Sequence, residues 1–595
     1  MLIFAVGAHL GWLFGRGELL SGLLTDTDSY TRLVRVRELW QGAAWTDPVT
    51  PSFSAPEGLS LHWTRVLDVL ILAPAALLHG LAGLSQEAAL TWAGGLISPL
   101  LHLLLVLAAY RAARLIWPLP GAWLAAVFVL SSPILFGYSA PGRADHHALI
   151  VLCGTLCLWA GLRALRGRRP PAAGWAAGAA GGLGVWVSPE ALLFLTPVLA
   201  GFGIGWLAGP RPASAAAQGL RAALAAAAVL LLAILTERAQ AARWIIAYDV
   251  VALPHLALLC GQALVFALVL PASRLSARAR LALGGAVAAA VAAALLSAFP
   301  TLAPGLSDPA LLGQQPGGPE PLAFADVQEG QPLSFGSWPD AMAALQVLGG
   351  TTLLGLPVLA LQAWRMRRSA RLAPLAMVGV MLLMTLFATV SALRFAADLA
   401  LPAALAAAGF TVLLARRFQP RVQALLRPPV ALIVILLPVL TVPAGAREPP
   451  SSPASCAAES IARLLVVLLP ADADPRPILF SDDANAGPAL AWFAPVRVVG
   501  APYHRGAAAL ADTDRLVVAS DEREAQALIA RRQASLLLFC RDRPGLAEGF
   551  RAALLAGAPP PAWLAPIALP EDLAQRFQLW RVLPDRLGEA SAAPP

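Results

Sequence analysis

Long apolar segments recur along the chain from the N-terminus to about residue 445. Most of them run for roughly 17 to 25 residues, and a helix of that length crosses about 30 Å of hydrocarbon. The segments lie near residues 1–15, 88–110, 120–137, 147–162, 172–187, 190–208, 219–235, 255–271, 281–299, 341–362, 372–390, 395–414 and 430–445. The pattern therefore predicts an α-helical polytopic membrane protein with about thirteen transmembrane helices.

A further apolar stretch, residues 66–84, decides the predicted topology. If it spans the membrane, the arginine-rich loops at 163–169, 274–280 and 365–371 lie outside the cytoplasm. If it lies along the outer surface instead, these loops are cytoplasmic, as the positive-inside rule requires. Pro74 and the small residues around it also disfavour a spanning helix. We therefore predict a juxtamembrane helix, with the N-terminus of the chain inside and its C-terminus outside.

This topology places three long hydrophilic stretches on the outer side: residues 16–87, residues 300–340 and the tail. A shorter outer loop covers residues 138–147. The tail alternates short β-type runs (ILF, VRVVG, RLVVA and SLLLF) with helical stretches such as AESIARLLVVLL and EREAQALIARR. We predict a transmembrane part at 1–446 and an extracytoplasmic α/β domain at 447–595.

The composition agrees with this pattern. Of the 595 residues, 58% are hydrophobic and 13% are charged, and the mean hydropathy is +0.68, which excludes an ordinary soluble protein. The net charge of +8 comes from arginine, because the chain contains no lysine. These arginines cluster in short loops between apolar segments, so topology accounts for the basic charge and we predict no nucleic-acid partner.

The five cysteines show no spacing typical of a metal site. Cys153 and Cys157 lie on one face of an apolar segment, where small buried residues are expected. Cys456 and Cys540 both fall in the tail, and they can form a disulfide if the tail lies outside the cytoplasm. The N-terminal segment lacks a charged start and a cleavage site, so it is interpreted as a first helix rather than a signal peptide.

Acidic residues gather at the predicted outer surface, where a carboxylate needs a compensating cation or hydrogen-bond donor. The motif TDTDSY at residues 25–30 follows the first span directly. Its carboxylates, Asp26 and Asp28, are two residues apart and can reach one divalent cation. The alternative is structural, with Asp28 as the N-cap of the helix that follows.

A second motif, GRADHH at residues 142–147, lies in the outer loop before the fourth span. A carboxylate followed by two imidazoles suits Mn²⁺ or Mg²⁺, and Zn²⁺ remains open. A cap at the start of the next helix is the alternative. A third acidic motif, DVQE at residues 326–329, lies in the Pro- and Gly-rich loop at 300–340, where an acidic residue in a flexible loop is the simplest reading.

Arg394 opens the twelfth span at its outer end, against the positive-inside rule. A cation in this position requires an anion, and a phosphate head group is one candidate. The alternative is a snorkelling side chain paired with Asp398, one helical turn further along the chain.

Together these sites resemble the catalytic subunit of oligosaccharyltransferase in its single-subunit bacterial and archaeal forms, and more broadly the GT-C glycosyltransferases. TDTDSY matches the first acidic motif of that family, and GRADHH its second motif in the Asp-His-His form. DVQE is similar to the fifth-loop motif, and LRF at 393–395 resembles the Arg-Phe start of a late span. The resemblance covers nearly the whole chain, including the span count, the two long outer loops and the C-terminal domain.

The resemblance implies a metal-dependent site. Asp28, Asp145 and His147 are the implied metal ligands, with Asp26 as a further candidate. The implied cofactor is a divalent cation, Mn²⁺ or Mg²⁺. Asp28 therefore has a second interpretation besides helix capping.

The resemblance also implies roles in catalysis and substrate binding. Asp28 and Glu329 are the implied catalytic groups, which orient or deprotonate the acceptor. Arg394 contacts the donor phosphate, with Arg143 as an additional contact. Tyr30, in the first motif, is the remaining substrate-binding candidate.

The implied function is transfer of a sugar or oligosaccharide from a polyprenyl-phosphate or polyprenyl-pyrophosphate donor, at the periplasmic face of a bacterial inner membrane. Membrane lipid and the donor are the expected partners. One family motif is missing, the Trp-Trp-Asp-Tyr-Gly sequence that recognises the acceptor Ser or Thr of a protein glycosylation sequon. Its expected position holds LFSDDANAG at 479–487, and the nearby APYHRG at 501–506 matches no family motif. The acceptor therefore stays open among protein, lipid and glycan.

Two other classes of function compete with the enzyme. A transporter or flippase for a lipid-linked glycan needs ionisable residues near the middle of several spans. A non-catalytic envelope-glycan assembly protein needs only a binding surface on the tail. Because the acidic residues gather at one surface and the spans carry few charges, the sequence favours an enzyme at the membrane interface.

Overall fold

The computed structural model describes residues 2–166, 172–300, 331–440, 458–470, 475–543 and 548–587. The chain divides into two compact units. The first, here called the helical unit, comprises Met1–Leu24, Trp63–Leu306 and Glu329–Ala444. The second, here called the mixed unit, comprises Thr25–His62, Ser307–Gln328 and Gly445–Pro595.

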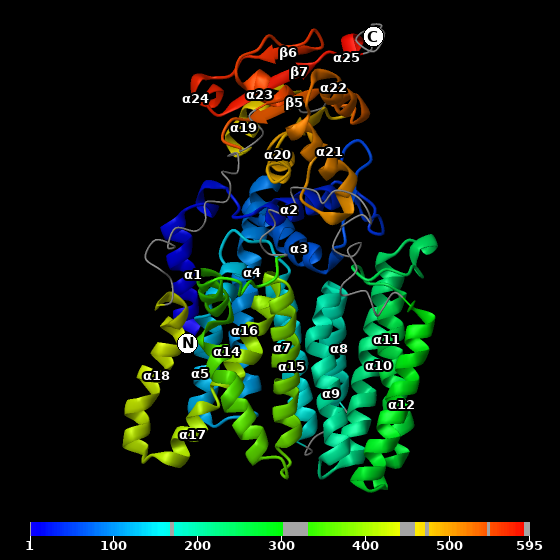
Figure 1. The fold of residues 1–595 in the computed structure, drawn as a ribbon, viewed down its shortest axis with the longest axis vertical. Helices are drawn as coiled ribbons and strands as arrows, with labels where there is room; N and C mark the ends of the chain where they lie inside the picture. The colour runs from blue at the N-terminus through cyan, green and yellow to red at the C-terminus, as the bar shows by residue number, and fades with distance from the viewer. Residues whose placement is uncertain are drawn as a thin grey trace. The chain divides into compact units, whose positions relative to one another are not determined.

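The helical unit consists of long helices that run side by side (Figure 1). Its helices are α1 (Leu2–Arg16), α3 (Arg65–Ala82), α4 (Gln86–Ala113), α5 (Leu119–Leu130), α6 (Pro133–Tyr138), α7 (His147–Leu165), α8 (Ala172–Val187), α9 (Leu192–Ala208), α10 (Pro212–Glu237), α11 (Leu253–Val269), α12 (Ala277–Ala298), α14 (Trp338–Arg365), α15 (Leu372–Ser391), α16 (Ala396–Ala407), α17 (Phe410–Arg417) and α18 (Pro420–Leu440). Each apolar segment predicted to span the membrane overlaps one or two of these helices.

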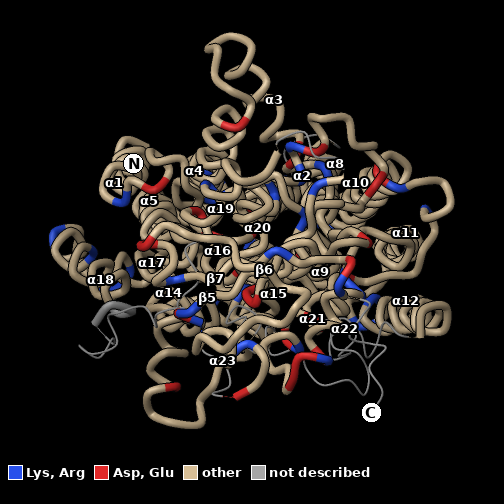
Figure 2. Tube along the Cα trace, turned by 90° about the horizontal axis from the view of Figure 1, so that it is seen from above, with Lys and Arg blue, Asp and Glu red and all other residues tan. Residues whose placement is uncertain are grey.

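Within the described residues, nine helices are long and apolar enough to cross a membrane, judged by length and composition. Shorter apolar helices are Leu2–Arg16, Leu119–Leu130, Ala172–Val187 and Leu253–Val269. The prediction of a multi-pass, mainly helical membrane protein is therefore confirmed. Helix α3 is one of the nine, and it extends sideways from the other helices of this unit when they are seen from above (Figure 2), so its juxtamembrane position stays a prediction.

Small residues bring the helices α8 and α10 into close contact. A Cβ atom added to Gly178 would lie 2.0 Å from the carbonyl oxygen of Ala222. One added to Gly182 would lie 2.9 Å from the Cα of Ala226. Without a hydrophobic driving force between helices in lipid, such close backbone approach is a main source of packing energy. The Ala- and Gly-rich composition of these segments thus has a direct structural role.

The mixed unit contains a five-stranded sheet with the strand order β4-β3-β5-β7-β6. Its strands are β3 (Ile478–Ser481), β4 (Arg497–Val498), β5 (Leu536–Cys540), β6 (Leu564–Ile567) and β7 (Phe577–Val582). Strand β3 is parallel to β4 and β5, whereas β7 is antiparallel to β5 and β6. The helices of the C-terminal segment are α19 (Ala458–Leu468), α20 (Gly487–Phe493), α21 (Ala507–Val518), α22 (Glu522–Arg531), α23 (Phe550–Leu555), α24 (Glu571–Ala574) and α25 (Pro584–Leu587). The predicted α/β character of the tail is confirmed.

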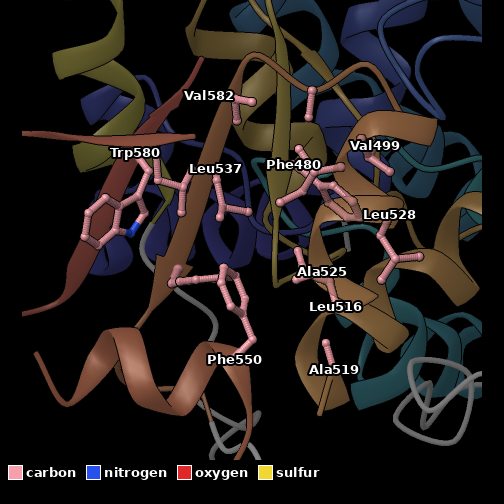
Figure 3. Close-up of a cluster of buried hydrophobic side chains, with 14 of the residues drawn as sticks. Phe480, Val499, Leu516, Ala519, Ala525, Leu528, Leu537, Phe550, Trp580 and Val582 are labelled. Carbon is pink, nitrogen blue, oxygen red and sulfur yellow. The ribbon is translucent and has the colours of Figure 1, made fainter. Parts of the chain in front are cut away.

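The apolar core of the mixed unit lies between this sheet and its helices (Figure 3). Phe480 and Leu537 from the central strands are fully buried. Leu528 from α22 and Phe550 from α23 pack in the same cluster. Burial of these large side chains stabilises the α/β arrangement by roughly 1.5–3 kcal/mol per side chain.

The strand prediction for the tail was wrong in detail. The run RLVVA, expected as a strand, forms the end of the helix α21, because the preceding Ala-rich stretch favours a helix that buries Leu510 and Leu516 on one side. Strands β6 and β7 were not predicted. Pro566 lies in β6, and this strand is at the edge of the sheet, where a missing N–H group is tolerated.

Residues 25–62, predicted as part of the first outer loop, fold with the C-terminal segment. They contain α2 (Thr27–Trp40) and a short hairpin of β1 (Val49–Thr50) and β2 (Leu59–Ser60). The guanidinium of Arg37 donates to the carbonyl oxygens of Ala491 and Trp492 at 2.6 and 2.7 Å. The backbone N–H of Val498 donates to the carbonyl oxygen of Ser52 at 2.8 Å. The mixed unit is therefore assembled from two distant parts of the sequence.

The cysteines follow the expected division. Cys153 and Cys157 are free and buried in α7. Cys540, at the end of β5, is disulfide-bonded. Its predicted partner, Cys456, lies outside the described residues, so the pairing of these two cysteines stays a prediction.

The contact between α8 and α10 yields a test of the helical unit. We expect Gly178→Leu to lower the thermal stability of the detergent-solubilised protein, because the added side chain must separate the two backbones, at a cost of roughly 1–3 kcal/mol or more. The matched control is Gly285→Leu in α12, where a Cβ meets no atom within 4 Å. Equal unfolding temperatures for the two variants would contradict this account of the packing.

Candidate active site

A short loop anchored on α4 positions the GRADHH motif at the start of α7. The N–H of Gly142 donates to the carbonyl oxygen of Gly95 at 2.8 Å, and Gly142 has a positive φ of 95°. Ser98 of α4 also exchanges two 3.4 Å hydrogen bonds with the backbone of Asp145. Glycine is favoured at residue 142 because few other residues adopt that backbone conformation. The loop thereby fixes the carboxylate of Asp145 next to the first turn of α7.

The side chains of Asp145, His146 and His147 form one compact group. Each offers one ligand atom, and these atoms all lie within 4.8 Å of one another. The carboxylate of Asp145 accepts the N–H of His147 at 3.2 Å and lies 3.1 Å from Nδ1 of His146. The N-cap of α7 is His146, without a side-chain cap hydrogen bond, so Asp145 is not the cap, although it accepts the first N–H of the helix and lies beside both imidazoles.

Burial and charge act on Asp145 in opposite directions. Burial by itself raises the pKa of the Asp145 carboxyl, but the imidazoles of His147 and His146 and the guanidinium of Arg143 lower it more. The resulting pKa is well below the ordinary value. The side chain is 3% exposed and is a carboxylate at neutral pH, as a metal ligand must be.

Aromatic rings surround the two imidazoles. The rings of His146 and His147 stack with their centroids 4.8 Å apart. Tyr138 lies 4.7 Å from the ring of His147, and Trp63 lies 6.0 Å from the ring of His146. This apolar surround limits the access of water and strengthens electrostatic interactions within the group.

Two further charged residues of the helical unit lie near this group. Glu190 belongs to a short 3₁₀ helix (Pro189–Ala191) between α8 and α9, and Arg394 to another (Leu393–Phe395) before α16. Their side chains form an ion pair of 2.9 Å between Nη2 of Arg394 and Oε1 of Glu190. Glu190 also interacts electrostatically with His147 and Asp145. The Arg394 side chain is 44% exposed, although its Nε is buried, so an anion can reach part of this side chain.

The structural alternative for Arg394 was wrong in its choice of partner. Asp398 follows one turn later in α16, but Arg394 pairs with Glu190 instead. Asp398 is completely buried, and its carboxylate interacts electrostatically with His147, Glu190 and Arg394. Glu190 and Asp398 were both missed as site residues. The sequence signal for Glu190 was a charge placed between two apolar segments, in the run SPEA.

The first acidic motif lies in the mixed unit, and its two carboxylates, Asp26 and Asp28, have different structural roles. Asp26 is the N-cap of α2, and its side chain accepts the N–H of Ser29 at 2.8 Å. The capping alternative for Asp28 was therefore wrong, because Asp26 is the cap and Asp28 lies in the first turn. Asp28 thus does not cap the helix, whereas one oxygen of Asp26 is occupied by the cap.

Tyr503 holds Asp28 in place. Its hydroxyl donates to Oδ1 of Asp28 at 2.7 Å and lies 2.8 Å from the hydroxyl of Thr31. Burial raises the pKa of Tyr503 well above its ordinary value, and the negative charge of Asp28 raises it further. The phenol therefore stays protonated and keeps donating. The unassigned run APYHRG thus contains a residue that positions a predicted catalytic carboxylate.

The remaining predicted site residues lie in different places. Tyr30 is buried in the mixed unit, where its ring contacts Phe493 and its hydroxyl lies 3.5 Å from Glu459. Arg143 stacks over Tyr138 at 4.8 Å in the helical unit. Glu329 lies outside the described residues. The helical unit thus brings together Asp145, His147 and Arg394, while the participation of Asp28 and Glu329 stays a prediction.

The donor set fits a divalent cation. One ionised carboxylate and two imidazoles lie close enough to share an ion, and further carboxylates are present nearby. Oxygen ligands with an imidazole suit Mn²⁺ or Mg²⁺, and the second imidazole also suits Zn²⁺. The chemistry of the group therefore agrees with the predicted cofactor class without selecting one metal.

The comparisons with known proteins agree with the fold. Residues 75–213 match the family model described as dolichyl-phosphate-mannose-protein mannosyltransferase. No curated protein sequence matches the chain. Because the family model covers less than a quarter of the chain, it indicates relatedness of this segment, which contains α4, the GRADHH loop and Glu190.

Solved structures of an archaeal oligosaccharyltransferase are similar over most of the chain. AglB from Archaeoglobus fulgidus, in complex with an inhibitory peptide and a dolichol-phosphate, matches with a TM-score of 0.68 and 16% identity over 87% of this chain. The same archaeal enzyme with Zn and sulfate matches with a TM-score of 0.63 and 15% identity, also over 87% of this chain. These matches cover 66% and 64% of the archaeal chain, slightly less than two thirds. The expected GT-C fold is therefore confirmed.

The contact between Tyr503 and Asp28 can be measured. We expect Tyr503→Phe to lower the unfolding temperature of the full-length protein, since loss of a hydrogen bond to a charged group costs roughly 1.5–3 kcal/mol. Combined with Asp28→Asn, the two effects should be less than additive. The control is Tyr110→Phe, whose hydroxyl makes no hydrogen bond within the described chain. Strictly additive effects would rule out the direct contact.

Proposed function

We propose that this protein is an integral-membrane, metal-dependent glycosyltransferase of the oligosaccharyltransferase type. It transfers a sugar or an oligosaccharide from a polyprenyl-phosphate or polyprenyl-pyrophosphate donor to an acceptor at the outer face of the bacterial inner membrane. One observation carries the proposal. The ligand atoms of Asp145, His146 and His147 lie within 4.8 Å of one another, in the same unit as the accessible guanidinium of Arg394.

The donor phosphate is bound by Arg394. The planar guanidinium of a side chain that is almost half exposed, at the start of an apolar helix, suits the geometry of phosphate oxygens. Its partner Glu190 orients the guanidinium before the donor arrives. Arg143 lies on the Asp145 loop and adds positive charge to the same region. The donor phosphate would therefore lie near the guanidinium of Arg394 and near the residues that would hold the divalent metal ion.

The residues of the metal group prepare the leaving group for departure. Asp145 and His147 would hold the divalent cation, and Asp28 stays the further ligand that the sequence predicts. When bound, the cation supplies positive charge that stabilises the phosphate as it leaves. Asp145 suits this role because it remains ionised at neutral pH and is fixed by the N–H of His147.

The reaction is a single displacement at the anomeric carbon. A nucleophilic oxygen or nitrogen of the acceptor forms the new bond, while the bond from the anomeric carbon to the phosphate oxygen breaks. The acceptor proton passes to Asp28 or Glu329, and the electron pair of the broken bond leaves with the phosphate. One displacement inverts the configuration of the anomeric carbon. Tyr503 supports this step by fixing the Asp28 carboxylate.

The similar proteins support the donor class. The archaeal oligosaccharyltransferase was solved with a dolichol-phosphate, with Zn and sulfate, and with a tethered acceptor peptide that contains the NVT sequon. The matched family model is described as a dolichyl-phosphate-mannose-protein mannosyltransferase. Polyprenyl phosphate is the chemical feature common to these donors, so it is the class we propose here.

We expect this protein to recognise its acceptor in a different way from the enzymes of protein N-glycosylation. The segment at the expected sequon-binding position is occupied by internal contacts. Asp482 pairs with Arg551 at 2.6 Å and accepts the N–H of Cys540, and Asp483 lies 3.7 Å from Arg543. These side chains stabilise the mixed unit and leave no tryptophan pair for an acceptor hydroxyl. Protein, lipid and glycan acceptors are therefore all to be tested.

The decisive experiment removes the metal group. We expect Asp145→Asn to lower the rate of sugar transfer by at least about 100-fold, because the charge that holds the cation is lost. Transfer is measured in proteoliposomes with a labelled lipid-linked sugar fraction and with protein, lipid and glycan acceptors. A chelator should abolish wild-type transfer, and Mn²⁺ or Mg²⁺ should restore it. The control is Asp340→Asn, at the start of α14.

The outcomes separate the competing functions. A flippase would move the donor across the bilayer without forming a glycosylated product. A non-catalytic assembly protein would bind glycan equally well after chelation. Full transfer activity in Asp145→Asn, or wild-type transfer that resists chelation, would refute the proposed enzyme mechanism.

Arg394 provides an independent prediction about the donor. We expect Arg394→Ala to weaken donor binding by about 10- to 100-fold, since a charge-assisted hydrogen bond to phosphate is lost. Arg394→Lys should restore part of this loss, because the charge returns without the planar fork. The readout is the KM for the lipid-linked donor. The control is Arg367→Ala, whose guanidinium binds the backbone of Trp364. An unchanged KM in Arg394→Ala would exclude the phosphate contact.

A further inference from the structure

A cavity lies between the helices α7 and α8, at the end of α7 that is opposite to the GRADHH loop. Nearer the start of α7 the two helices touch. A Cβ added to Gly184 would lie 3.2 Å from the Cβ of Cys153, and one added to Gly181 would lie 3.0 Å from Sγ of Cys157. Beyond this contact the helices border a cavity of about 560 Å³. Ligand pockets in proteins typically have volumes of roughly 300–1,000 Å³.

The walls of this cavity are mainly apolar. On α7 the lining residues Leu156, Trp159 and Ala160 lie on one helix face, because they are spaced three or four positions apart. On α8 the lining residues are alanines, whose short side chains leave the space unfilled. Ala172 and Ala176 in this wall are exposed, so no other described helix covers it. In a membrane-spanning bundle such an uncovered wall meets lipid.

Arginines stand at the end of the cavity. Arg163 and Arg166, in the last turn of α7 and directly after it, both line the cavity. The guanidinium of Arg163 stacks over the ring of Trp159 at 5.4 Å. Nη2 of Arg166 donates to the carbonyl oxygen of Leu115, the residue that follows Arg114 at the end of α4. The ends of α4 and α7 thus bring these basic side chains together.

The start of α15 adds a further arginine to this end of the helices. A Cβ added to Gly205 would lie 3.1 Å from Cδ2 of Leu165 and 3.6 Å from the Cβ of Ala373. The last turn of α7 and the first turn of α15 therefore meet, and Arg371 is the N-cap of α15. Burial, followed by the like charge of Arg371, lowers the pKa of Arg166, in agreement with this arrangement.

The sequence supplies no carboxylate next to these four arginines. The segments 88–144, 146–189 and 341–397, which contain them, include no aspartate or glutamate. Within the described residues none of the four forms an ion pair. The positive-inside rule accounts for basic residues at this end of the helices, but it does not account for an apolar cavity beside them. An anion joined to a hydrocarbon chain would satisfy both features.

We propose that this cavity binds an anionic phospholipid of the surrounding membrane. Arg163 and Arg166 contact the phosphate of its head group, and one acyl chain fills the cavity between α7 and α8. The site is separate from the metal group, because α7 has 19 residues and its two ends are about 28 Å apart. It does not depend on the proposed function. By the predicted topology this end faces the cytoplasm, where the leaflet is rich in anionic lipid.

The test measures lipid binding by native mass spectrometry of the full-length protein in a mild detergent. We expect the wild type to bind dioleoylphosphatidylglycerol at least about 5-fold more tightly than dioleoylphosphatidylcholine. The double variant Arg163→Gln/Arg166→Gln should lose affinity for the anionic lipid by roughly 5-fold per arginine removed. The matched control is Arg278→Gln, which alters an exposed arginine in the first turn of α12, outside the cavity. This control should bind as the wild type does.

A second pair of variants tests the place of the acyl chain. Ala176→Trp puts an indole into the cavity and should weaken binding of dioleoylphosphatidylglycerol at least about 5-fold, since the chain loses its apolar contacts. The matched control is Ala179→Trp, at an exposed alanine of the same helix that does not line the cavity. It should leave the affinity unchanged.

The outcomes decide the proposal. Equal affinity of the wild type and the double arginine variant for the anionic lipid would overturn it, as would equal affinity of the wild type for the two lipids. If excess inorganic phosphate displaces the lipid and Ala176→Trp binds normally, the arginines form a site for free phosphate and the proposal is wrong. If loss of the Arg166 contact with Leu115 prevents folding, Arg163→Gln alone and Ala176→Trp give the same test.

Discussion

A charged side chain inside an apolar helix bundle needs a partner of opposite charge, and this constraint organises the helical unit around one group of residues. Its carboxylates at Asp145, Glu190 and Asp398 come from three separate segments and interact with the same imidazoles or guanidinium. Each helix that contributes one of them must therefore keep its place relative to the others. The electrostatic group and the helix packing thus depend on each other.

The site in the helical unit also depends on contacts that carry no charge. Ser98 and Gly95 of α4 hold the loop before α7 by backbone hydrogen bonds. Close contacts between small residues allow α8 and α10 to approach, and the segment with Glu190 follows α8 directly. The arrangement of the candidate site is therefore supported by helix packing that the lipid itself does not provide.

The sequence was sufficient to predict the helices, because long apolar segments have one stable conformation in a membrane. It also predicted Asp145, His147 and Arg394 as site residues, and the structure places all three in the helical unit. It did not identify Glu190, since a single charge between two apolar segments has no local pattern that distinguishes a ligand from a loop residue. The role of Tyr503 was equally invisible, because its partner Asp28 lies 475 residues away. Long-range pairs of this kind are decided by tertiary packing, and the same limit applies to the run RLVVA, where a helix replaced the predicted strand.

The mixed unit combines α2, near the start of the chain, with a sheet formed by its last part. During synthesis α2 emerges long before the residues that cover it, since Arg37 and its contact Trp492 are 455 positions apart in the sequence. Nearly the whole helical unit is made between these two events. The first acidic motif can therefore reach its final surroundings only after the last segment has been translated, and a truncated chain leaves it without Tyr503. The order of biosynthesis thus delays completion of this unit until the segment that contains Tyr503 has been made.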